Sequence, residues 1–297
     1  MSLADNDKKI IYTGPSRRGF HRLQLAAECL QKFAWSHRIP KDPNLKQEGT
    51  KPAEPKSPAL ARGSLMHLAL AQHYARIKAK QEGTPVDDWC EPEEAVKLIA
   101  KLEKCEEHVD DILKTYEAYQ DRFWGDEQEF RVIGVEMLQE TMIADKYLFT
   151  GRFDLIVEDQ LGRIYVQDHK TTGFIKAAQK EFYAVSGQLI GYGYMAREKY
   201  GAKYAGMKVN LVQVGQKPGF ERINLSRSPF LEQSFVQFVV DTEEAIERMD
   251  ASGRNFDNWP KAMNEMTCYG RYGACNFIEW CKHGYGAKKG GNWSWNG

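Results

Sequence analysis

The chain has 297 residues and a mass of 34.0 kDa, and its 41 basic residues balance its 41 acidic residues. A net charge of zero lacks the positive excess that is typical of nucleic-acid-binding proteins, although acidic residues predominate in 87–129 and basic residues in 1–40 and 251–297. The sequence has no signal peptide and no apolar run long enough for a membrane helix, so we expect a cytoplasmic protein without structural disulfides that does not bind a membrane.

Hydrophobic periodicity and turn residues predict the order of helices and strands. The expected order is helix 16–36, helix 57–81 (beginning at Ser57-Pro58), helix 91–124, strand 130–143, strand 146–158, strand 163–169, helix 177–200, strand 206–214, short strand 220–225 and helix 229–250. We therefore expect an α/β protein, with a mixed central sheet flanked by helices and an α-β-β-β-α-β core.

The most informative stretch is a predicted hairpin whose strands carry Asp154 and Asp168. The two residues lie at similar distances from the turn, so their carboxylates can meet on one face, and Lys170 shares the face of Asp168. Two carboxylates and an amine can hold Mg²⁺ or Mn²⁺ and a water beside a phosphate, which suits phosphodiester hydrolysis. A surface hairpin with solvated charges is the alternative. Glu136, on the strand over 130–143, is a further candidate for the same site.

Other candidates come from helices and from the first residues of the chain. Gln188 and Tyr192 are four residues apart, so they project from one helix face and can contact a phosphate or a base. His67, on the helix over 57–81, can bind a metal or a phosphate. Arg17 and Arg18 are candidate phosphate contacts. Packing or solvation of these side chains is the alternative in each case.

These motifs, taken together and in order, resemble the RecB-like branch of the PD-(D/E)XK nuclease superfamily. They are Gly-x-x-x-His at His67, Gly-x-x-Asp at Asp154, Asp-x-Lys at Asp168 and Lys170, and Gln-x-x-x-Tyr at Gln188 and Tyr192. The resemblance covers roughly residues 57–215 and implies a restriction-endonuclease-like core, here with a helical insertion and a C-terminal cysteine-rich loop. Asp168 stands where many members of the family have Glu, which the motif allows.

The resemblance also implies a role for each matching residue. It implies metal ligands at His67, Asp154, Asp168 and the backbone carbonyl of His169. It implies that Lys170 assists the attacking water, and that Gln188 and Tyr192 place DNA.

Three cysteines near the C-terminus form a C-x6-C-x5-C pattern at Cys268, Cys275 and Cys281. This Gly- and aromatic-rich stretch buries little core, so a metal would supply its order, and Cys29 is the best candidate for a fourth ligand. An iron–sulfur subgroup of the family, with AddB-type and CRISPR-associated RecB-like exonucleases, has one cysteine before the nuclease core and three after it. The resemblance therefore implies a [4Fe–4S] cluster. The first gap is longer than in those relatives, so a Zn²⁺ site and unligated thiols stay as alternatives.

Cysteines at opposite ends of the chain that share one site imply a single domain over residues 1–297. We expect a metal-dependent DNA nuclease, specifically an exonuclease, in recombination, repair or phage DNA processing, in a bacterium or a phage-infected host. A recombination or helicase protein is the expected partner besides DNA. The alternatives are a non-catalytic nucleic-acid-binding subunit on the same fold and an endonuclease of a restriction system.

Overall fold

The computed structural model describes residues 8–11, 13–14, 16–38, 57–225, 228–270 and 273–284. The chain divides into two compact units that are each built from several segments. The first unit comprises Met1–Gly19, Lys56–Met142 and Leu148–Phe235, and the second comprises Phe20–Pro55, Ile143–Tyr147 and Val236–Gly297.

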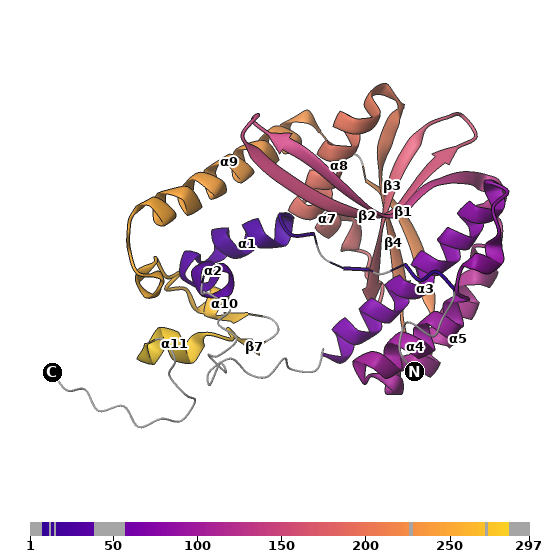
Figure 1. Ribbon diagram of the computed structural model, residues 1–297, viewed down its shortest axis with the longest axis horizontal. Helices are drawn as coiled ribbons and strands as arrows, with labels where there is room; N and C mark the ends of the chain where they lie inside the picture. The colour runs from indigo at the N-terminus through magenta and orange to yellow at the C-terminus, as the bar shows by residue number, and fades with distance from the viewer. Residues whose placement is uncertain are drawn as a thin grey trace. The chain divides into compact units, whose positions relative to one another are not determined.

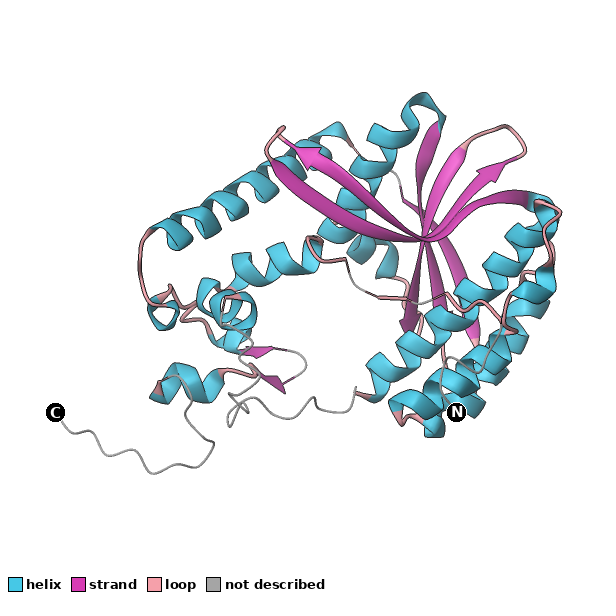
Figure 2. Ribbon diagram, in the orientation of Figure 1, coloured by secondary structure: helices cyan, strands magenta, loops and turns pink. Residues whose placement is uncertain are grey.

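A five-stranded sheet in the order β1-β2-β3-β4-β5 is the centre of the first unit (Figures 1 and 2). Its strands are β1 (Phe130–Ile143), β2 (Tyr147–Asp159), β3 (Ile164–Thr172), β4 (Tyr204–Gln213) and β5 (Gly219–Leu225). The pair β2–β3 is antiparallel, β3–β4 is parallel and β4–β5 is antiparallel. A parallel pair needs a crossover, which α8 (Gly187–Tyr200) supplies. The mixed sheet flanked by helices is the architecture that the sequence predicted.

Three helices pack together over one face of the sheet, namely α3 (Pro58–Gln81), α4 (Pro92–Glu103) and α5 (Val109–Arg122). The Ser57 hydroxyl accepts the backbone N–H of Leu60 and caps α3, which confirms the predicted start signal. The main apolar cluster of this unit joins Leu65, Leu70 and Tyr116 of the helices to Leu155 and Val212 of the sheet. Short helical turns connect these elements along the chain: η2 (Val86–Asp88) lies between α3 and α4, η3 (Glu106–His108) between α4 and α5, and α6 (Asp126–Glu129) between α5 and β1.

Helix α8 covers the opposite face of the sheet. The ring of His169 stacks on Tyr74 of α3, whereas the next side chain on the strand, Lys170, bonds to Gln188 of α8. Successive side chains of a strand point to opposite faces, so α3 and α8 lie on opposite sides. Around α8 lie α7 (Gln179–Ala184), η4 (Gly201–Lys203) and the start of α9 (Pro229–Ala251). A Cβ on Gly191 of α8 would lie 2.6 Å from the Phe235 ring, so only glycine allows this close approach.

The second unit contains mostly short elements. Its helices are α1 (Phe20–Glu28), α2 (Leu30–His37), η5 (Phe256–Asn258), α10 (Glu265–Cys268) and α11 (Ile278–His283), with the rest of α9, and its two-residue strands are β6 (Tyr269–Gly270) and β7 (Gly273–Ala274). Phe33 and Trp259 stack in a small apolar cluster with Ile246 of α9.

Three of the predicted helices are interrupted in the structure. The helix predicted over 16–36 begins only at Phe20 and is broken at Cys29, which has an extended backbone and accepts the N–H of Lys32 at 3.4 Å. The helix predicted over 91–124 ends at Glu103, because Lys104 adopts the left-handed conformation (φ 55°). The helix predicted over 177–200 is interrupted between α7 and α8. In each case the hydrophobic pattern continues across the break, so periodicity alone did not show it.

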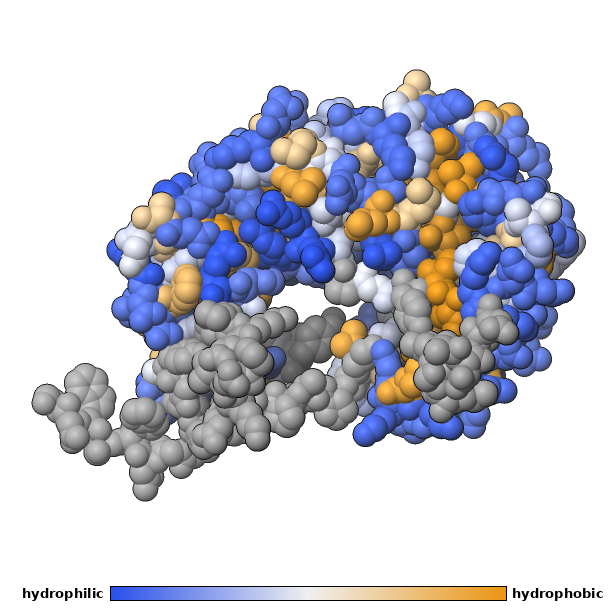
Figure 3. Space-filling model, in the orientation of Figure 1, coloured by the Kyte–Doolittle hydropathy of each residue, from blue (hydrophilic) through white to orange (hydrophobic). Residues whose placement is uncertain are grey.

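The face drawn in Figure 3 is mostly hydrophilic, with hydrophobic residues gathered in a few patches. Within the described residues, no helix combines the length and the apolar character that crossing a bilayer requires.

Candidate active site

The two predicted carboxylates lie on neighbouring strands of the first unit. The pairing of β2 with β3 ends at Leu155 and Gln167, one residue from Asp154 and Asp168, and the Asp168 charge acts on the Asp154 carboxylate. Asp154 Oδ2 accepts the backbone N–H of His169 at 2.7 Å, so a side-chain carboxylate replaces a backbone carbonyl as the acceptor for this strand N–H. The structure therefore brings the two carboxylates to one point of the sheet, as their distances from the turn predicted.

Lys170 links the carboxylates to α8. Its Nζ lies 2.8 Å from Asp168 Oδ2 and donates to Gln188 Oε1 at 3.1 Å. Gln188 Nε2 in turn donates to the hydroxyl of Tyr192 at 3.2 Å. Burial lowers the pKa of Lys170, but the Asp168 and Asp154 carboxylates outweigh it, so the pKa lies above its ordinary value and the amine carries a proton.

His67 and Glu136 complete the cluster around Asp154. The Nδ1 atom of His67 lies 3.5 Å from Asp154 Oδ2. One ligand atom from each of His67, Glu136 and Asp154 lies within 4.8 Å of the other two. Glu136 reaches the site from β1 through a left-handed backbone (φ 49°), and Arg152 Nη1 donates to its carbonyl at 2.9 Å. A non-glycine residue in this conformation inside a strand is strained, and such strain is concentrated at functional sites.

The acidic groups are crowded and largely cut off from solvent. Burial, followed by the Asp154 carboxylate, raises the pKa of Glu136 to about 9. Burial also raises the pKa of Asp154 to about 6, although the nearby His67 lowers it. Hard oxygen atoms and an imidazole at this spacing fit a divalent metal ion, which would offset the repulsion between the carboxylates. The residues present therefore fit the metal that the motifs imply.

A buried polar network lies behind the site, on the α3 side of the sheet. Asn210 Nδ2 lies 2.8 Å from His169 Nδ1 and donates to the Tyr119 hydroxyl at 3.0 Å. The Tyr119 and Tyr74 hydroxyls are 2.7 Å apart, and Tyr74 donates to Asp126 Oδ2 at 2.6 Å. Burial lowers the pKa of His169 well below its ordinary value, so its ring is neutral. Sequence patterns did not predict this network, because its five members come from five separate elements.

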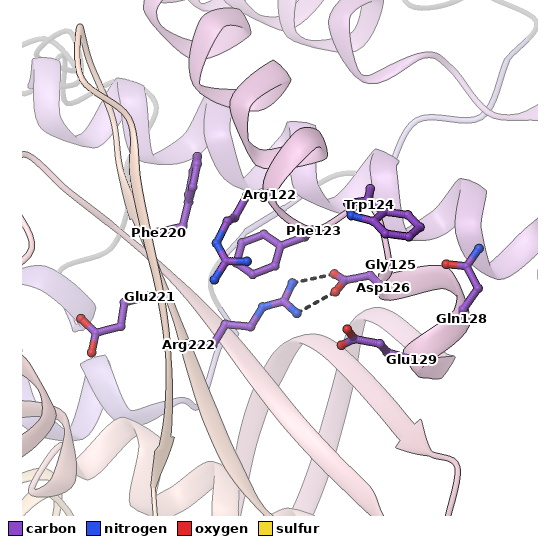
Figure 4. Close-up of a pocket in the computed structure, with 10 residues that line it drawn as sticks. All are labelled: Arg122, Phe123, Trp124, Gly125, Asp126, Gln128, Glu129, Phe220, Glu221 and Arg222. Atoms are coloured by element: carbon purple, nitrogen blue, oxygen red, sulfur yellow. Dashed lines mark hydrogen bonds and ion pairs between the residues drawn. The ribbon is translucent and has the colours of Figure 1, made fainter.

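The outer end of the network borders a cavity of about 780 Å³ between the end of α5, α6 and β5 (Figure 4). Both nitrogens of the Arg222 fork donate to the Asp126 carboxylate, at 2.7 and 2.6 Å, and Arg222 also lies over the Phe123 ring. The residues that line this cavity do not include any of the motif residues. The cavity is therefore separate from the acidic cluster.

Arg17 and Arg18 lie beside β2 in the first unit. Arg18 exchanges backbone and side-chain hydrogen bonds with Thr150, and both arginines are exposed. The structure thus places them at the edge of a strand that carries Asp154, but it gives them no contact with the acidic cluster.

The four expected cysteines surround one pocket of the second unit, with a volume of about 290 Å³. Cys29 lies at the break between α1 and α2, while Cys268, Cys275 and Cys281 lie along α10, the β6–β7 hairpin and α11. The indole rings of Trp35 and Trp280, with Phe277, pack beside Cys281. Within the described residues, no three of these sulfur atoms all lie within 4.8 Å of one another.

Four thiolates can hold either a zinc ion or a [4Fe–4S] cluster. Cys90 and Cys105 are buried in the first unit and do not line this pocket.

The fold and the acidic cluster together define a class of protein. A mixed sheet, an Asp on each strand of an antiparallel pair and a Lys two residues beyond the second Asp are the features of a phosphodiester-hydrolysing α/β nuclease. The chain belongs to the PD-(D/E)XK nuclease superfamily, whose family profile matches residues 20–282. The chain is therefore a nuclease by family, as the motifs predicted.

Two solved structures show a distant likeness to the chain. A proposed exonuclease from Eubacterium rectale is 13% identical, with a TM-score of 0.40 over 74% of this chain and 75% of that one. The structure of SSO0001 is 17% identical, with a TM-score of 0.30 over 60% of this chain and 74% of that one. Neither likeness is close enough to indicate an activity here. No match was found among curated proteins.

Proposed function

We propose that the chain is a metal-dependent deoxyribonuclease that removes nucleotides from DNA ends. The single observation that carries this proposal is the convergence of Asp154, Asp168 and Lys170 with His67 and Glu136 at one point of the sheet. A non-catalytic binding subunit would have no need of a buried, mutually repelling set of carboxylates, which costs stability unless a function requires it.

Under this proposal each group has one task. Asp154 and Asp168, with His67, Glu136 and the carbonyl of His169, would hold one or more Mg²⁺ or Mn²⁺ ions. The metal, when bound, lowers the pKa of a water and polarises the phosphate. Lys170, which is protonated, sits beside Asp168 and stabilises negative charge that develops on the phosphate.

The neighbouring polar groups would position the DNA strand. Gln188 holds Lys170 and is itself held by the buried Tyr192, so the pair fixes the amine, and the half-buried Gln188 would offer a neutral group to the substrate. Arg17 and Arg18 are exposed beside β2 and would contact phosphates further along the strand.

The proposal also assigns a [4Fe–4S] cluster to Cys29, Cys268, Cys275 and Cys281. It is supported by the pocket that the four cysteines share. The cluster would be structural, because it lies in the second unit and all the groups with a proposed role in catalysis lie in the first.

Linear and covalently closed circular DNA of one sequence separate the exonuclease from its alternatives. With Mg²⁺ or Mn²⁺ and anaerobically purified protein, we expect mononucleotides or short products from linear DNA and no cut in the circle. Cutting of the circle would instead select an endonuclease. Binding without cleavage under any of these conditions would select a non-catalytic subunit.

A further inference from the structure

The segment between β3 and α8, residues 173–186, begins and ends at the catalytic cluster. It leaves β3 shortly after Lys170 and returns just before Gln188, and these two side chains are bonded at 3.1 Å. Helix α7 forms its second half beside α8 (Figure 1). Any group on this segment therefore lies within a few nucleotides of the point where a bound strand would be cut.

The segment exposes an unusual amount of apolar surface. The exposed fractions are 65% for Phe174, 66% for Phe182 and 68% for Val185. Single exposed apolar residues are common, but three of this size within twelve residues beside a catalytic cluster indicate a binding surface. Phe182 also lies edge-on to Tyr183, with 5.1 Å between the ring centroids.

The backbone that carries these rings is held in place. Phe174 exchanges two hydrogen bonds with the Thr172 hydroxyl, at 2.9 and 3.2 Å. The N–H of Ile175 donates to Gln213 on β4 at 3.0 Å. The N–H of Lys176 donates to Gln179 at the start of α7 at 2.8 Å. The rings are thus presented from an ordered base, which reduces the entropy lost on binding.

The charge of the segment indicates what binds to it. Lys176 and Lys180 are exposed and both lie between Phe174 and Phe182 in the sequence, and Glu181 is the only acidic residue between Gly173 and Ser186. Exposed aromatic rings with cations beside them are the combination that binds single strands, because unpaired bases stack on the rings and phosphates pair with the lysines. Bases in a duplex are already stacked on one another and do not offer their faces.

We propose that Phe174 and Phe182 form a base-stacking platform that receives unpaired DNA next to the catalytic cluster, with Lys176 and Lys180 contacting its phosphates. The inference rests on the proposed function and narrows its substrate to single-stranded DNA or single-stranded ends.

The test measures binding without cleavage. Fluorescence anisotropy in EDTA gives the dissociation constants of a labelled oligothymidylate and of a duplex of equal length. The variants are Phe174→Ala, Phe182→Ala and Phe182→Leu. Phe230→Ala is the matched control, because Phe230 is 72% exposed on α9, outside the segment.

Each alanine variant should weaken oligothymidylate binding about tenfold, and the duplex and the Phe230→Ala control should change little. Phe182→Leu should behave like Phe182→Ala, because leucine keeps the apolar area but has no ring to stack on. Abasic residues placed at the end of the oligonucleotide should reduce the effect of Phe182→Ala, since the parent protein then has no base to stack on the Phe182 ring.

Three results would each overturn the platform. They are unchanged binding in both alanine variants, equal losses for single-stranded and duplex DNA, and full binding by Phe182→Leu, which would indicate a merely apolar docking surface. Failure of the proposed function looks different, because the parent protein would then bind oligothymidylate through these rings and cleave nothing with Mg²⁺ or Mn²⁺.

Discussion

Lys170 keeps its proton although it is largely enclosed. The Asp168 and Asp154 carboxylates outweigh the effect of burial, which alone would lower the pKa of the amine. A protonated amine cannot take a proton from water. Under the proposed function it therefore acts as a fixed positive charge, and its value to catalysis depends on the Asp168 and Gln188 contacts that hold it in place.

Replacement of Lys170 by methionine should separate catalysis from metal binding. We predict that Lys170→Met lowers the cleavage rate about a hundredfold or more. Mn²⁺ should still raise the melting temperature of this variant, because the carboxylates and His67 are intact. Lys203→Met, an exposed lysine of η4, is the control and should change neither quantity. Loss of the Mn²⁺ effect in Lys170→Met would show that the lysine organises the metal site instead.

The raised pKa of Glu136 predicts how stability depends on pH in the metal-free protein. The carboxyl titrates at about 9 in the folded chain and near 4.5 without burial and its neighbours. Between these values the folded state holds a proton that the unfolded state has released, so the free energy of unfolding falls as the pH rises. Asp154 acts in the same direction over a narrower range.

Glu136→Gln should remove the larger part of this fall in the free energy of unfolding with rising pH. In the metal-free protein, calorimetry should show a higher melting temperature than that of the parent at pH 8 and a nearly equal one at pH 5. Glu140→Gln, an exposed position on the same strand, should not show this difference. The burial of this carboxyl would be contradicted if the melting temperature of Glu136→Gln, compared with that of the parent, were lower at pH 8 than at pH 5.

At the scale of helices and strands, the sequence predicted the order of the elements and the meeting of Asp154 with Asp168, because both depend on local patterns. The start of α3 at Ser57-Pro58 also depends on a local signal, a capping serine followed by a proline. The break at Cys29 was not predictable, since the residues around it keep a helical pattern. The left-handed backbone at Glu136 and the network behind His169 depend on contacts between distant segments, which periodicity does not record.

The Asp126–Arg222 pair connects α6 to β5 inside this network. Removing one partner leaves the other charge buried and unpaired, so we predict that Asp126→Ala destabilises the protein by about 3 kcal/mol or more in urea unfolding. Replacing both partners by apolar residues, as in Asp126→Leu with Arg222→Met, should cost less than the single change. Equal or greater loss in the double variant would show that the pair itself, and not the stranded charge, stabilises this edge of the sheet.

At the scale of the whole molecule, the two kinds of site are divided between the two units. The acidic cluster is built only from the first unit and the cysteine pocket only from the second. If the proposed cluster is structural, its loss should loosen the second unit and leave the acidic cluster intact.

Cys29→Ser tests this division. Anaerobic parent protein should be brown and carry about four irons per chain, and Cys29→Ser should lose the colour and most of the iron. Hydrogen exchange should then speed up in α1 and α2 and stay unchanged in α3 and β3. Cys105→Ala, at a cysteine outside the pocket, should keep its iron. Zinc in place of iron in a colourless, active parent would select the zinc site, and an absence of both metals would leave four free thiols.

The central claim, that Asp154, Asp168 and Lys170 form the centre of a metal-dependent nuclease, is tested most directly by cleavage of end-labelled DNA. Rates would be measured with Mn²⁺, with Mg²⁺ and in EDTA for the parent, Asp154→Asn, Asp168→Asn, Lys170→Met and the control Glu140→Gln. We predict cleavage by the parent and the control only when metal is present, and its loss in the three site variants while they remain folded. Cleavage at the parental rate by all three variants, or by the parent in EDTA, would contradict the claim.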